Sequence, residues 1–442
     1  MTLSTPLFRR LSPCRYPLGI ALLLMLAACA QEDVPDPFMP RNQHEAYYHA
    51  LQQAGLTETA LGRDWMERAH QAIAEPVRVE PPLEEMLYLD PTRADAIAFR
   101  FAARRGHKLQ IEVETLGESA GKLFIDLFRA GEGLARHVAT ASDDQVIGFE
   151  PRRDGEYVLR IQSELLRGGS FRARIMKVPA FDFPVAGGHT RDIGSFFGDP
   201  RDGGRRKHHG IDIFAPKGTP VIAPTDGYVR FTGERGLGGL VVWMRDEQRD
   251  QTLYFAHLNE IIVGRHTYVR AGDTLGTVGN TGNARTTPPH LHFGIYQQGP
   301  IDPLHYVAFA DSEPEAARAD TRMLAQTMRV VRPAYITPDR GQRLELQRHQ
   351  LVRVSGARGD LLRVALPDGT CGYIPYRAIE PTDEPLNQHT IADNTILHPL
   401  PGIEHAPIEV LRPGAEVAVL GRNDDFLYVR SDIGQTGWVL SH

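Results

Sequence analysis

Hydrophobic spacing divides the first part of the chain into a helical stretch and a strand-forming stretch. Apolar residues between 61 and 73 recur at helical intervals and stop before Pro76, so we predict short helices over 42–76. Further on, apolar and polar residues alternate in runs that turn residues such as Asp154-Gly155 separate. This pattern predicts a small antiparallel β-sandwich over 85–179. No cluster of catalytic residue types lies in it, so we interpret it as a spacer or a binding module.

The end of the chain contains an internal repeat. The segment that begins at Val352 aligns without a gap with the segment that begins at Val417, at a constant offset of 65 residues. The same offset pairs Asp360 with Asp425, Leu362 with Leu427, Val364 with Val429, Gly369 with Gly434, Gly372 with Gly437 and Tyr373 with Trp438. Each copy has the size of a small barrel, so we predict two tandem β-barrels over 322–381 and 386–442.

The two predicted barrels resemble bacterial SH3-like modules, in which a Gly-Trp-Val sequence close to the end is typical. Gly437-Trp438-Val439 matches this feature, while the first copy has Gly372-Tyr373-Ile374. The SH3-like family commonly binds cell-wall peptides, which the resemblance therefore implies for these repeats. A spacer with the same fold is the alternative.

Between the sandwich and the repeats lies a stretch dense in Gly and His, which holds the candidate chemistry. Alternation along a strand points His290 and His292 to the same face. Upstream, His208 and Asp212 share parity along an extended segment. Carboxylate is a hard oxygen ligand and imidazole a borderline nitrogen ligand. A set of two His and one Asp with an open fourth position therefore suits catalytic Zn²⁺ better than a closed structural site.

An ordered series of motifs around these residues resembles the LytM/lysostaphin-type zinc metallopeptidases, which predicts a β-sheet peptidase domain of that type over 180–308. The series is Ser195-Phe196-Phe197-Gly198, His208-x-x-x-Asp212, Ala215-Pro216-x-Gly218-Thr219-Pro220-Val221, Asp226-Gly227-x-Val229, Ala256-His257-Leu258, Gly279-Asn280-Thr281-Gly282 and His290-x-His292. His209 beside His208 is an alternative first ligand, although the spacing to Asp212 favours His208.

The resemblance implies a role for each matching residue. His208, Asp212 and His292 would bind one Zn²⁺ ion per peptidase domain, and His257 and His290 would be the non-ligand catalytic pair. Zinc can lower the pKa of a bound water to about 7, and an imidazole can carry the proton to the leaving amine. We prefer His290 as general base and His257 as the group that stabilises the oxyanion, and the reverse order stays open.

The function implied is that of a zinc-dependent endopeptidase that hydrolyses peptide cross-links of bacterial peptidoglycan with a metal-activated water. Two alternatives are a non-catalytic activator of other cell-wall hydrolases and a zinc-dependent wall amidase or carboxypeptidase. The sequence departs from the family pattern where Phe255 replaces a common Tyr and where Asn283–Pro289 replaces a short Ser/Gly-rich loop. We interpret the Gly-rich stretch 201–206 as a variable loop, which does not support the family resemblance.

The N-terminus resembles a bacterial lipoprotein signal peptide. Arginines precede an apolar stretch from Leu18 to Ala28, which is too short to span a bilayer and ends in the lipobox-like Leu26-Ala27-Ala28-Cys29. We predict a signal peptide over 1–28, a tether over 29–41 and two acyl chains on Cys29, which would anchor the protein to a membrane. Ala30 after the Cys favours the outer membrane, facing the periplasm. A plain signal peptide with an incidental Cys is the alternative.

Composition and charge narrow the remaining classes. With 42 Gly and 32 Pro the chain favours many short strands, so the fold class is mainly β and multidomain. The 49 basic and 55 acidic residues give a net charge of −6 without a basic block, which argues against nucleic-acid binding. Cleavage would remove Cys14 and lipidation would use Cys29, so Cys371 has no partner for a disulfide. The sequence leaves the oligomeric state open.

Overall fold

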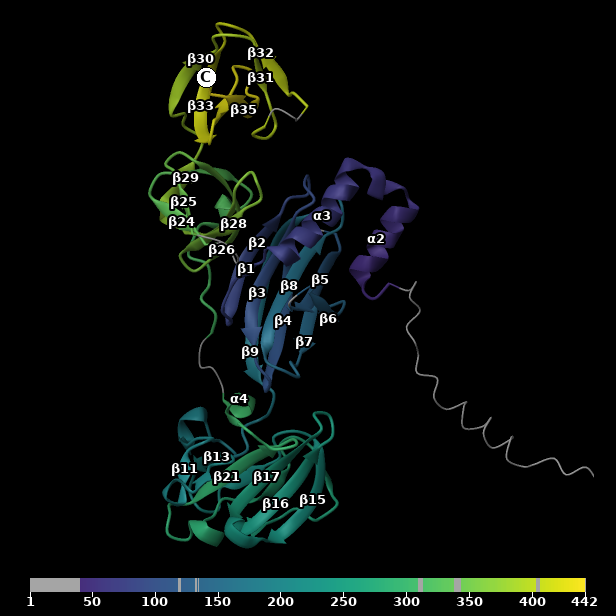
Figure 1. Ribbon diagram of the computed structural model, residues 1–442, viewed down its shortest axis with the longest axis vertical. Coiled ribbons are helices and arrows are strands. Elements are labelled where there is room, and N and C mark those ends of the chain that lie inside the picture. The colour runs from purple at the N-terminus through teal and green to yellow at the C-terminus, as the bar shows by residue number, and fades with distance from the viewer. Residues whose placement is uncertain are drawn as a thin grey trace, which may run out of the picture. The chain divides into compact units, whose positions relative to one another are not determined.

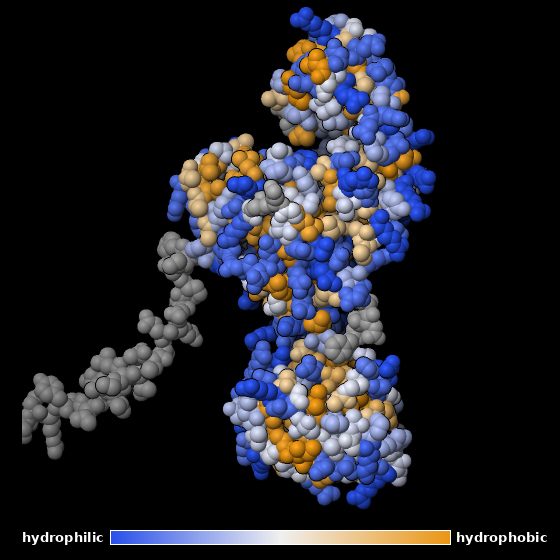
Figure 2. Space-filling model, turned by 180° about the vertical axis from the view of Figure 1, so that it is seen from behind, coloured by the Kyte–Doolittle hydropathy of each residue, from blue (hydrophilic) through white to orange (hydrophobic). Residues whose placement is uncertain are grey.

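Strands dominate the structure, which confirms the prediction of a mainly β chain (Figure 1). The computed structural model describes residues 40–441 except 118–120, 132, 134, 309–312, 338–342 and 403–405. The predicted signal peptide, the lipidation site Cys29 and nearly all of the tether lie outside the described residues. The face drawn in Figure 2 is largely hydrophilic, with apolar residues in small groups.

Helices α2 (Gln43–Gln53) and α3 (Ala60–Ala74) follow local capping signals. At the start of α2, the Asn42 side chain accepts a hydrogen bond from the backbone nitrogen of Glu45, whose carboxylate accepts from the backbone nitrogen of Arg41. At α3, the Thr59 hydroxyl accepts from the backbone nitrogen of Gly62 at 3.1 Å. Within the described residues, no helix combines the length and apolarity that crossing a membrane would need.

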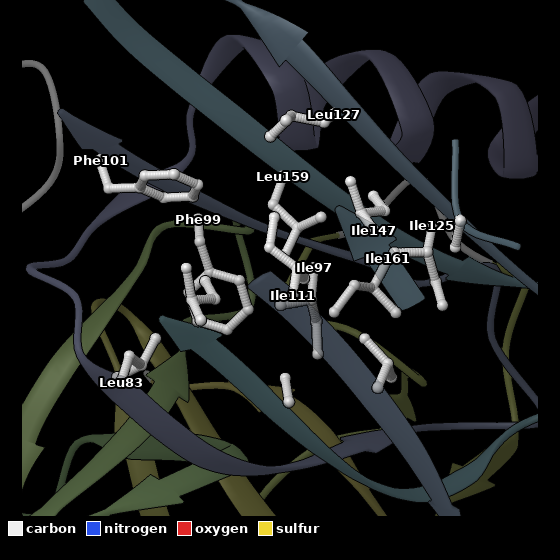
Figure 3. Close-up of a cluster of buried hydrophobic side chains, with 14 of the residues drawn as sticks. Leu83, Ile97, Phe99, Phe101, Ile111, Ile125, Leu127, Ile147, Leu159 and Ile161 are labelled. Carbon is white, nitrogen blue, oxygen red and sulfur yellow. The ribbon is translucent and has the colours of Figure 1, made fainter. Parts of the chain in front are cut away.

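Residues 77–179 form two facing sheets. One sheet has the order β1 (Val77–Arg78), β3 (Ala96–Ala103), β8 (Gly155–Ser163), β5 (Leu123–Arg129) and β6 (Arg136–Thr140). The other contains β2 (Leu83–Leu89), β9 (Gly169–Pro179), β4 (His107–Leu116) and β7 (Val146–Phe149). Alternate residues such as Phe99, Ile111 and Leu159 are fully buried and pack together between the sheets (Figure 3).

The second of these sheets continues into the first C-terminal repeat. Strand β26 (Leu351–Arg358) pairs with β2, with Met86 opposite Ala357 and Leu87 opposite Gly356. β27 (Leu361–Ala365) and β28 (Cys371–Pro375) extend the same sheet. The first repeat is therefore joined by backbone hydrogen bonds to the two-sheet part of the chain.

The internal repeat of the sequence is visible in the strand boundaries. β26, β27 and β28 have counterparts at the same offset of 65 residues, which are β33 (Glu416–Asn423), β34 (Phe426–Arg430) and β35 (Thr436–Leu440). The other described strands of the repeats are β23 (Thr327–Val330), β24 (Ala334–Ile336), β25 (Leu344–Leu346), β29 (Ile379–Pro381), β30 (Asn387–Thr390), β31 (Thr395–Leu397) and β32 (Glu409–Leu411). None of the sheets they form closes on itself among the described residues, so the predicted SH3-like barrels are not confirmed.

A long antiparallel sheet forms the centre of the stretch 181–307. Its order is β10 (Ile193–Ser195), β13 (Ile211–Phe214), β21 (His290–Tyr296), β17 (Gln251–Leu258), β16 (Leu240–Asp246), β15 (Gly227–Glu234) and β19 (Tyr268–Val269), with β22 (Pro300–Ile301) beside β21. A smaller sheet contains β14 (Pro220–Ile222), β20 (Thr274–Thr277) and β18 (Glu260–Ile261). Helix α4 (Leu304–Val307) ends this part.

The long sheet has one apolar face and one polar face. Ile211, Phe255 and Phe293 are fully buried in the core on one side. Because side chains alternate along a strand, the residues next to them in sequence point to the other side. That other face holds the candidate site.

Candidate metal centre

Adjacent strands bring three candidate ligands together. In the pairing of β13 with β21, Asp212 lies opposite His292, and His208 lies just before β13. His208 Nε2 is 3.0 Å from Asp212 Oδ1 and 2.9 Å from His292 Nδ1, and the latter two atoms are 3.0 Å apart. The structure thus places one atom of each predicted ligand around a common point.

This donor set fits a divalent metal ion. The potential ligand atoms of His208, Asp212 and His292 all lie within 4.8 Å of one another. The second ring nitrogen of His208, Nδ1, donates to the carbonyl oxygen of Phe196 at 2.8 Å, which leaves Nε2 as the atom with a free lone pair. Two imidazole nitrogens and one carboxylate oxygen are ligands that Zn²⁺ accepts in catalytic sites.

Two of the three groups have pKa values shifted toward the forms that bind a metal ion. Burial alone would raise the pKa of Asp212, but its contacts with the His208 and His292 rings hold it well below its ordinary value. Burial lowers the pKa of His292, against the opposing effect of the Asp212 carboxylate. The carboxylate is therefore ionised and the imidazole neutral at pH 7.

The predicted catalytic pair lies beside the ligands. The ring centres of His257 and His290 are 5.1 Å apart, and that of His257 is 6.0 Å from the ring of His292. His257 Nδ1 donates to the carbonyl of Thr281 and His290 Nδ1 donates to the carbonyl of Pro288, each at 2.9 Å. In its neutral form, each ring therefore has Nε2 as its proton acceptor.

Burial gives His257 a distinct electrostatic environment. It lowers the pKa of His257 to about 4, and the neighbouring His290 acts in the same direction, while the hydrogen bond to the Thr281 carbonyl opposes the shift. His257 also has a left-handed backbone, with φ of 62°, near the end of β17. The ring is thus held neutral at pH 7 next to the ligands.

The alternative ligand His209 does not join the group. His209 is exposed, whereas His208 is buried. The glycine between this pair and Asp212 has a local reason, because a Cβ atom on Gly210 would lie 2.9 Å from the His292 ring and 2.4 Å from the carbonyl oxygen of Phe293. The space beside Gly210 is therefore taken by a ligand side chain.

Arg201 is a site residue that the sequence interpretation missed. It lies at the end of β11 (Pro200–Arg201), in the stretch treated above as a variable loop. Arg201 Nη2 donates to Asp212 Oδ2 at 2.9 Å and also to the hydroxyl of Ser195. Since Oδ1 of Asp212 faces the histidines, Arg201 holds the opposite oxygen. The only signal in the sequence was a basic residue close to the first ligand.

The replacement of the common Tyr by Phe255 also has a structural answer. Phe255 is fully buried in the core, on the face of β17 away from the site. The preceding residue, Tyr254, lies on the site face with its ring centre 5.7 Å from that of His292. An aromatic ring therefore borders the metal ligands although the phenol is one position earlier in the sequence.

Comparison with known proteins identifies the class of this domain. Residues 206–303 match the sequence model of Peptidase family M23. This confirms that the chain carries an M23 peptidase domain of the LytM type. The match does not extend to the repeats or the N-terminus, so the SH3-like modules, the signal peptide and the lipid anchor stay predictions.

Several curated proteins are similar to this chain over about a quarter of its length. DD-carboxypeptidase/endopeptidase Mpg of Neisseria meningitidis serogroup B (strain ATCC 13091 / M2091) is 41% identical over 120 residues, 27% of this chain and 26% of that protein. L-Ala--D-Glu endopeptidase of Bacillus subtilis (strain 168) is 39% identical over 126 residues, 27% of this chain and 38% of that protein. Murein hydrolase activator NlpD of Salmonella dublin is 31% identical over 133 residues, 29% of this chain and 32% of that protein. The matched part thus spans between a quarter and two fifths of each of these relatives.

Proposed function

We propose that this protein is a zinc-dependent endopeptidase that hydrolyses peptide cross-links of bacterial peptidoglycan. The observation that carries the proposal is the convergence of His208, Asp212 and His292 beside two further imidazoles. The names of the relatives from Neisseria and Bacillus, both endopeptidases, support the reaction class. The M23 match supports a metallopeptidase in general, and the two-His, one-Asp donor set favours zinc as the metal.

In this mechanism His208, Asp212 and His292 hold the ion. When bound, Zn²⁺ supplies Lewis acidity toward the substrate carbonyl and lowers the pKa of water. His290 and His257 each present Nε2 as a proton acceptor because Nδ1 donates to a backbone carbonyl. We prefer His290 as the general base, because burial lowers the pKa of His257 to about 4 and so weakens that ring as a base at neutral pH. His290 then returns the proton to the leaving amine, and His257 contacts the substrate oxygen; the reverse assignment is the alternative.

Digestion of purified sacculi tests the reaction. A form lacking residues 1–29 should release uncross-linked muropeptides, and a chelator should stop the release, as mass analysis would show. Asp212→Ala and His292→Ala should lose both zinc and hydrolysis. His209→Ala is the matched control, because this exposed neighbour of His208 lies outside the ligand group. Turnover retained by either ligand variant would contradict the metal assignment.

Two alternatives remain as outcomes of the same digestion. The Neisseria relative is named a carboxypeptidase as well as an endopeptidase, so loss of a terminal residue without loss of cross-links would assign the former activity. The Salmonella relative is named an activator of murein hydrolases. A zinc-loaded, folded protein that cuts nothing but stimulates another hydrolase would support that role. The presence of all three ligands favours catalysis.

The remaining parts would hold the enzyme at the wall. We propose that Cys29 carries the lipid anchor in the outer membrane, facing the periplasm, and that the C-terminal repeats are SH3-like modules that bind wall peptides. Cys29→Ser should move the protein from the membrane fraction to the soluble periplasmic fraction. An unchanged membrane fraction would contradict the anchor.

A further inference from the structure

A cluster of three aromatic rings continues the site face of the long sheet away from the metal ligands. Trp243 on β16 lies opposite Tyr254 on β17, and Tyr254 lies opposite Gly294 on β21. The ring centres of Trp243 and Tyr254 are 4.4 Å apart, and that of Tyr296 is 5.5 Å from Trp243. We call Trp243, Tyr254 and Tyr296 the aromatic shelf.

The shelf is partly exposed and presents mainly carbon. All three residues are partly accessible, whereas Val242, which precedes Trp243, and Phe255, which follows Tyr254, are fully buried on the opposite face. The indole nitrogen of Trp243 is itself buried, so the exposed part of that side chain is ring carbon.

Glycines allow the rings to take these positions. A Cβ atom on Gly238 would lie 2.0 Å from the Tyr254 hydroxyl, and one on Gly294 would lie 3.1 Å from the ring of Tyr296. The loop and the strand that border the shelf therefore contain glycine where the rings approach them.

The distance to the metal ligands relates the shelf to the substrate. The Tyr254 ring lies beside the His292 ring, and the Trp243 ring lies beside that of Tyr254. The far end of the shelf is therefore no more than about 10 Å from the His292 ring. An extended peptide advances about 3.3–3.6 Å per residue, so this length corresponds to about three residues from the scissile bond.

We propose that the aromatic shelf is a substrate subsite that binds an aliphatic side chain of the peptide, within three residues of the bond that is cut. The inference rests on the proposed function, and it adds which part of the substrate the enzyme recognises. Packing of an aliphatic side chain against an aromatic surface is favourable because both remove apolar carbon from water. Such contacts let an enzyme discriminate between substrates whose side chains differ by a few methylene groups. The contact is with peptide, because the shelf begins beside a ligand of the ion that acts on the peptide bond.

Kinetics on a substrate series test the subsite. Once sacculus digestion has identified the bond, each aliphatic residue within three positions is replaced by Gly in synthetic cross-linked peptides. The wild type should lose about tenfold in kcat/KM, mainly through KM, at one of these positions. Trp243→Ala and Tyr296→Ala should lose this discrimination while keeping their zinc content, and Trp243→Phe should retain most of it.

The control is another aromatic pair of the same domain. Tyr228→Ala removes an exposed ring that packs on Tyr268 where β15 pairs with β19, at the end of the sheet away from the strands of the metal ligands, and it should behave as the wild type. Equal discrimination by wild type and both shelf variants at every position would overturn the subsite.

A binding measurement separates this inference from the proposed function. If the wild type cleaves none of the peptides, the proposed function fails. Calorimetry of the chelator-treated protein then measures binding of the same peptides and tests whether the shelf is a subsite. Binding that weakens about tenfold in Trp243→Ala and is unchanged in Tyr228→Ala would support the subsite. Binding that is equal in the two variants would overturn it.

Discussion

Arg201 shows how a residue outside the ligand set fixes a ligand. Its guanidinium holds Oδ2 of Asp212, while Oδ1 lies 3.0 Å from the ring nitrogens of both His208 and His292. With one oxygen held, rotation of the carboxylate away from the histidines would break a charge-assisted hydrogen bond. The ligand oxygen is therefore in place before an ion arrives.

Arg201→Met should weaken zinc binding by about 10- to 100-fold, because groups that orient ligands typically contribute that much to affinity. The measurement is competition against a chromogenic chelator, which reads affinity independently of turnover. Arg206→Met is the matched control, since Arg206 lies on the same hairpin in β12 (Arg206–Lys207) and pairs with the exposed Asp202. Equal affinities in the two variants would contradict the orienting role.

The sequence could predict the residues whose positions depend on strand alternation. His290 and His292 share a face because they are two apart on one strand, and Asp212 joins them because β13 pairs with β21. Arg201 could not be predicted in this way, because a hairpin with left-handed backbone at Asp202, Gly203 and Gly204 brings it back to the site. The contact of Arg201 with Asp212 depends on the shape of this turn, and not on the alternation of side chains along a strand.

At the scale of elements, helix α3 and strands β5 and β8 enclose a buried polar group. The Asp126 carboxylate on β5 is fully buried and accepts from Arg160 at 2.6 Å and from Thr140 at 2.7 Å. Beside this group, the Trp65 indole of α3 donates to the carbonyl of Ser163 on β8 at 2.8 Å. Alternation predicted strands here, but it gave no reason to expect a charge on a buried face.

Asp126→Asn should lower the free energy of unfolding by about 3–5 kcal/mol at pH 7, because it removes the opposite charge that faces the buried Arg160 guanidinium. Burial alone would raise the pKa of Asp126, but hydrogen bonds from His137, Thr140 and Arg160, together with the Arg160 charge, hold it below its ordinary value of 3.8. The stabilisation is therefore complete above about pH 4 and is lost as the pH falls through the lower folded-state pKa.

Urea unfolding at several pH values would check both parts of this prediction. The difference between wild type and Asp126→Asn should be constant near neutral pH and should shrink below about pH 4. Glu114→Gln is the control, because Glu114 forms an exposed ion pair with Arg172 on the neighbouring sheet and should cost at most about 1 kcal/mol. A difference that stays constant down to pH 2 would contradict the assignment.

At the scale of the molecule, the first repeat and the two-sheet part of the chain form a joint structure. Glu85 on β2 and Arg363 on β27 are almost completely buried and make an ion pair at 2.8 Å, and Tyr373 on β28 donates to the same carboxylate. The sequence predicted a β-barrel on one side of this contact and, on the other, a β-sandwich over 85–179 that includes only part of β2. It could not predict the pairing of β2 with β26, because an edge-to-edge contact between distant segments leaves no periodic signal.

Arg363→Met should cost about 3–5 kcal/mol in the free energy of unfolding, because the buried Glu85 carboxylate loses the opposite charge of Arg363 and keeps only the Tyr373 hydroxyl from this group. Replacing both residues by Met should recover much of the loss, since the uncompensated charge is then removed as well. Thermal unfolding of the two variants and of Arg377→Met, an exposed arginine of the same repeat, is the measurement. If the variant with Met at both positions is no more stable than Arg363→Met, the loss of the ion pair between Glu85 and Arg363 is not the cause of the destabilisation.

The shared sheet decides how the wall-binding role of the repeats can be tested. Removal of 322–442 would take away β26 and Arg363 together, leaving the edge of β2 unpaired and Glu85 without its partner. Removal of 386–442 leaves both in place. We therefore expect the shorter deletion to keep cleavage of a soluble peptide and to weaken sacculus binding. We expect the longer deletion to aggregate or to unfold at lower temperature. Sacculus pull-down with thermal unfolding separates the two effects; full binding after the shorter deletion would assign the second repeat a spacer role.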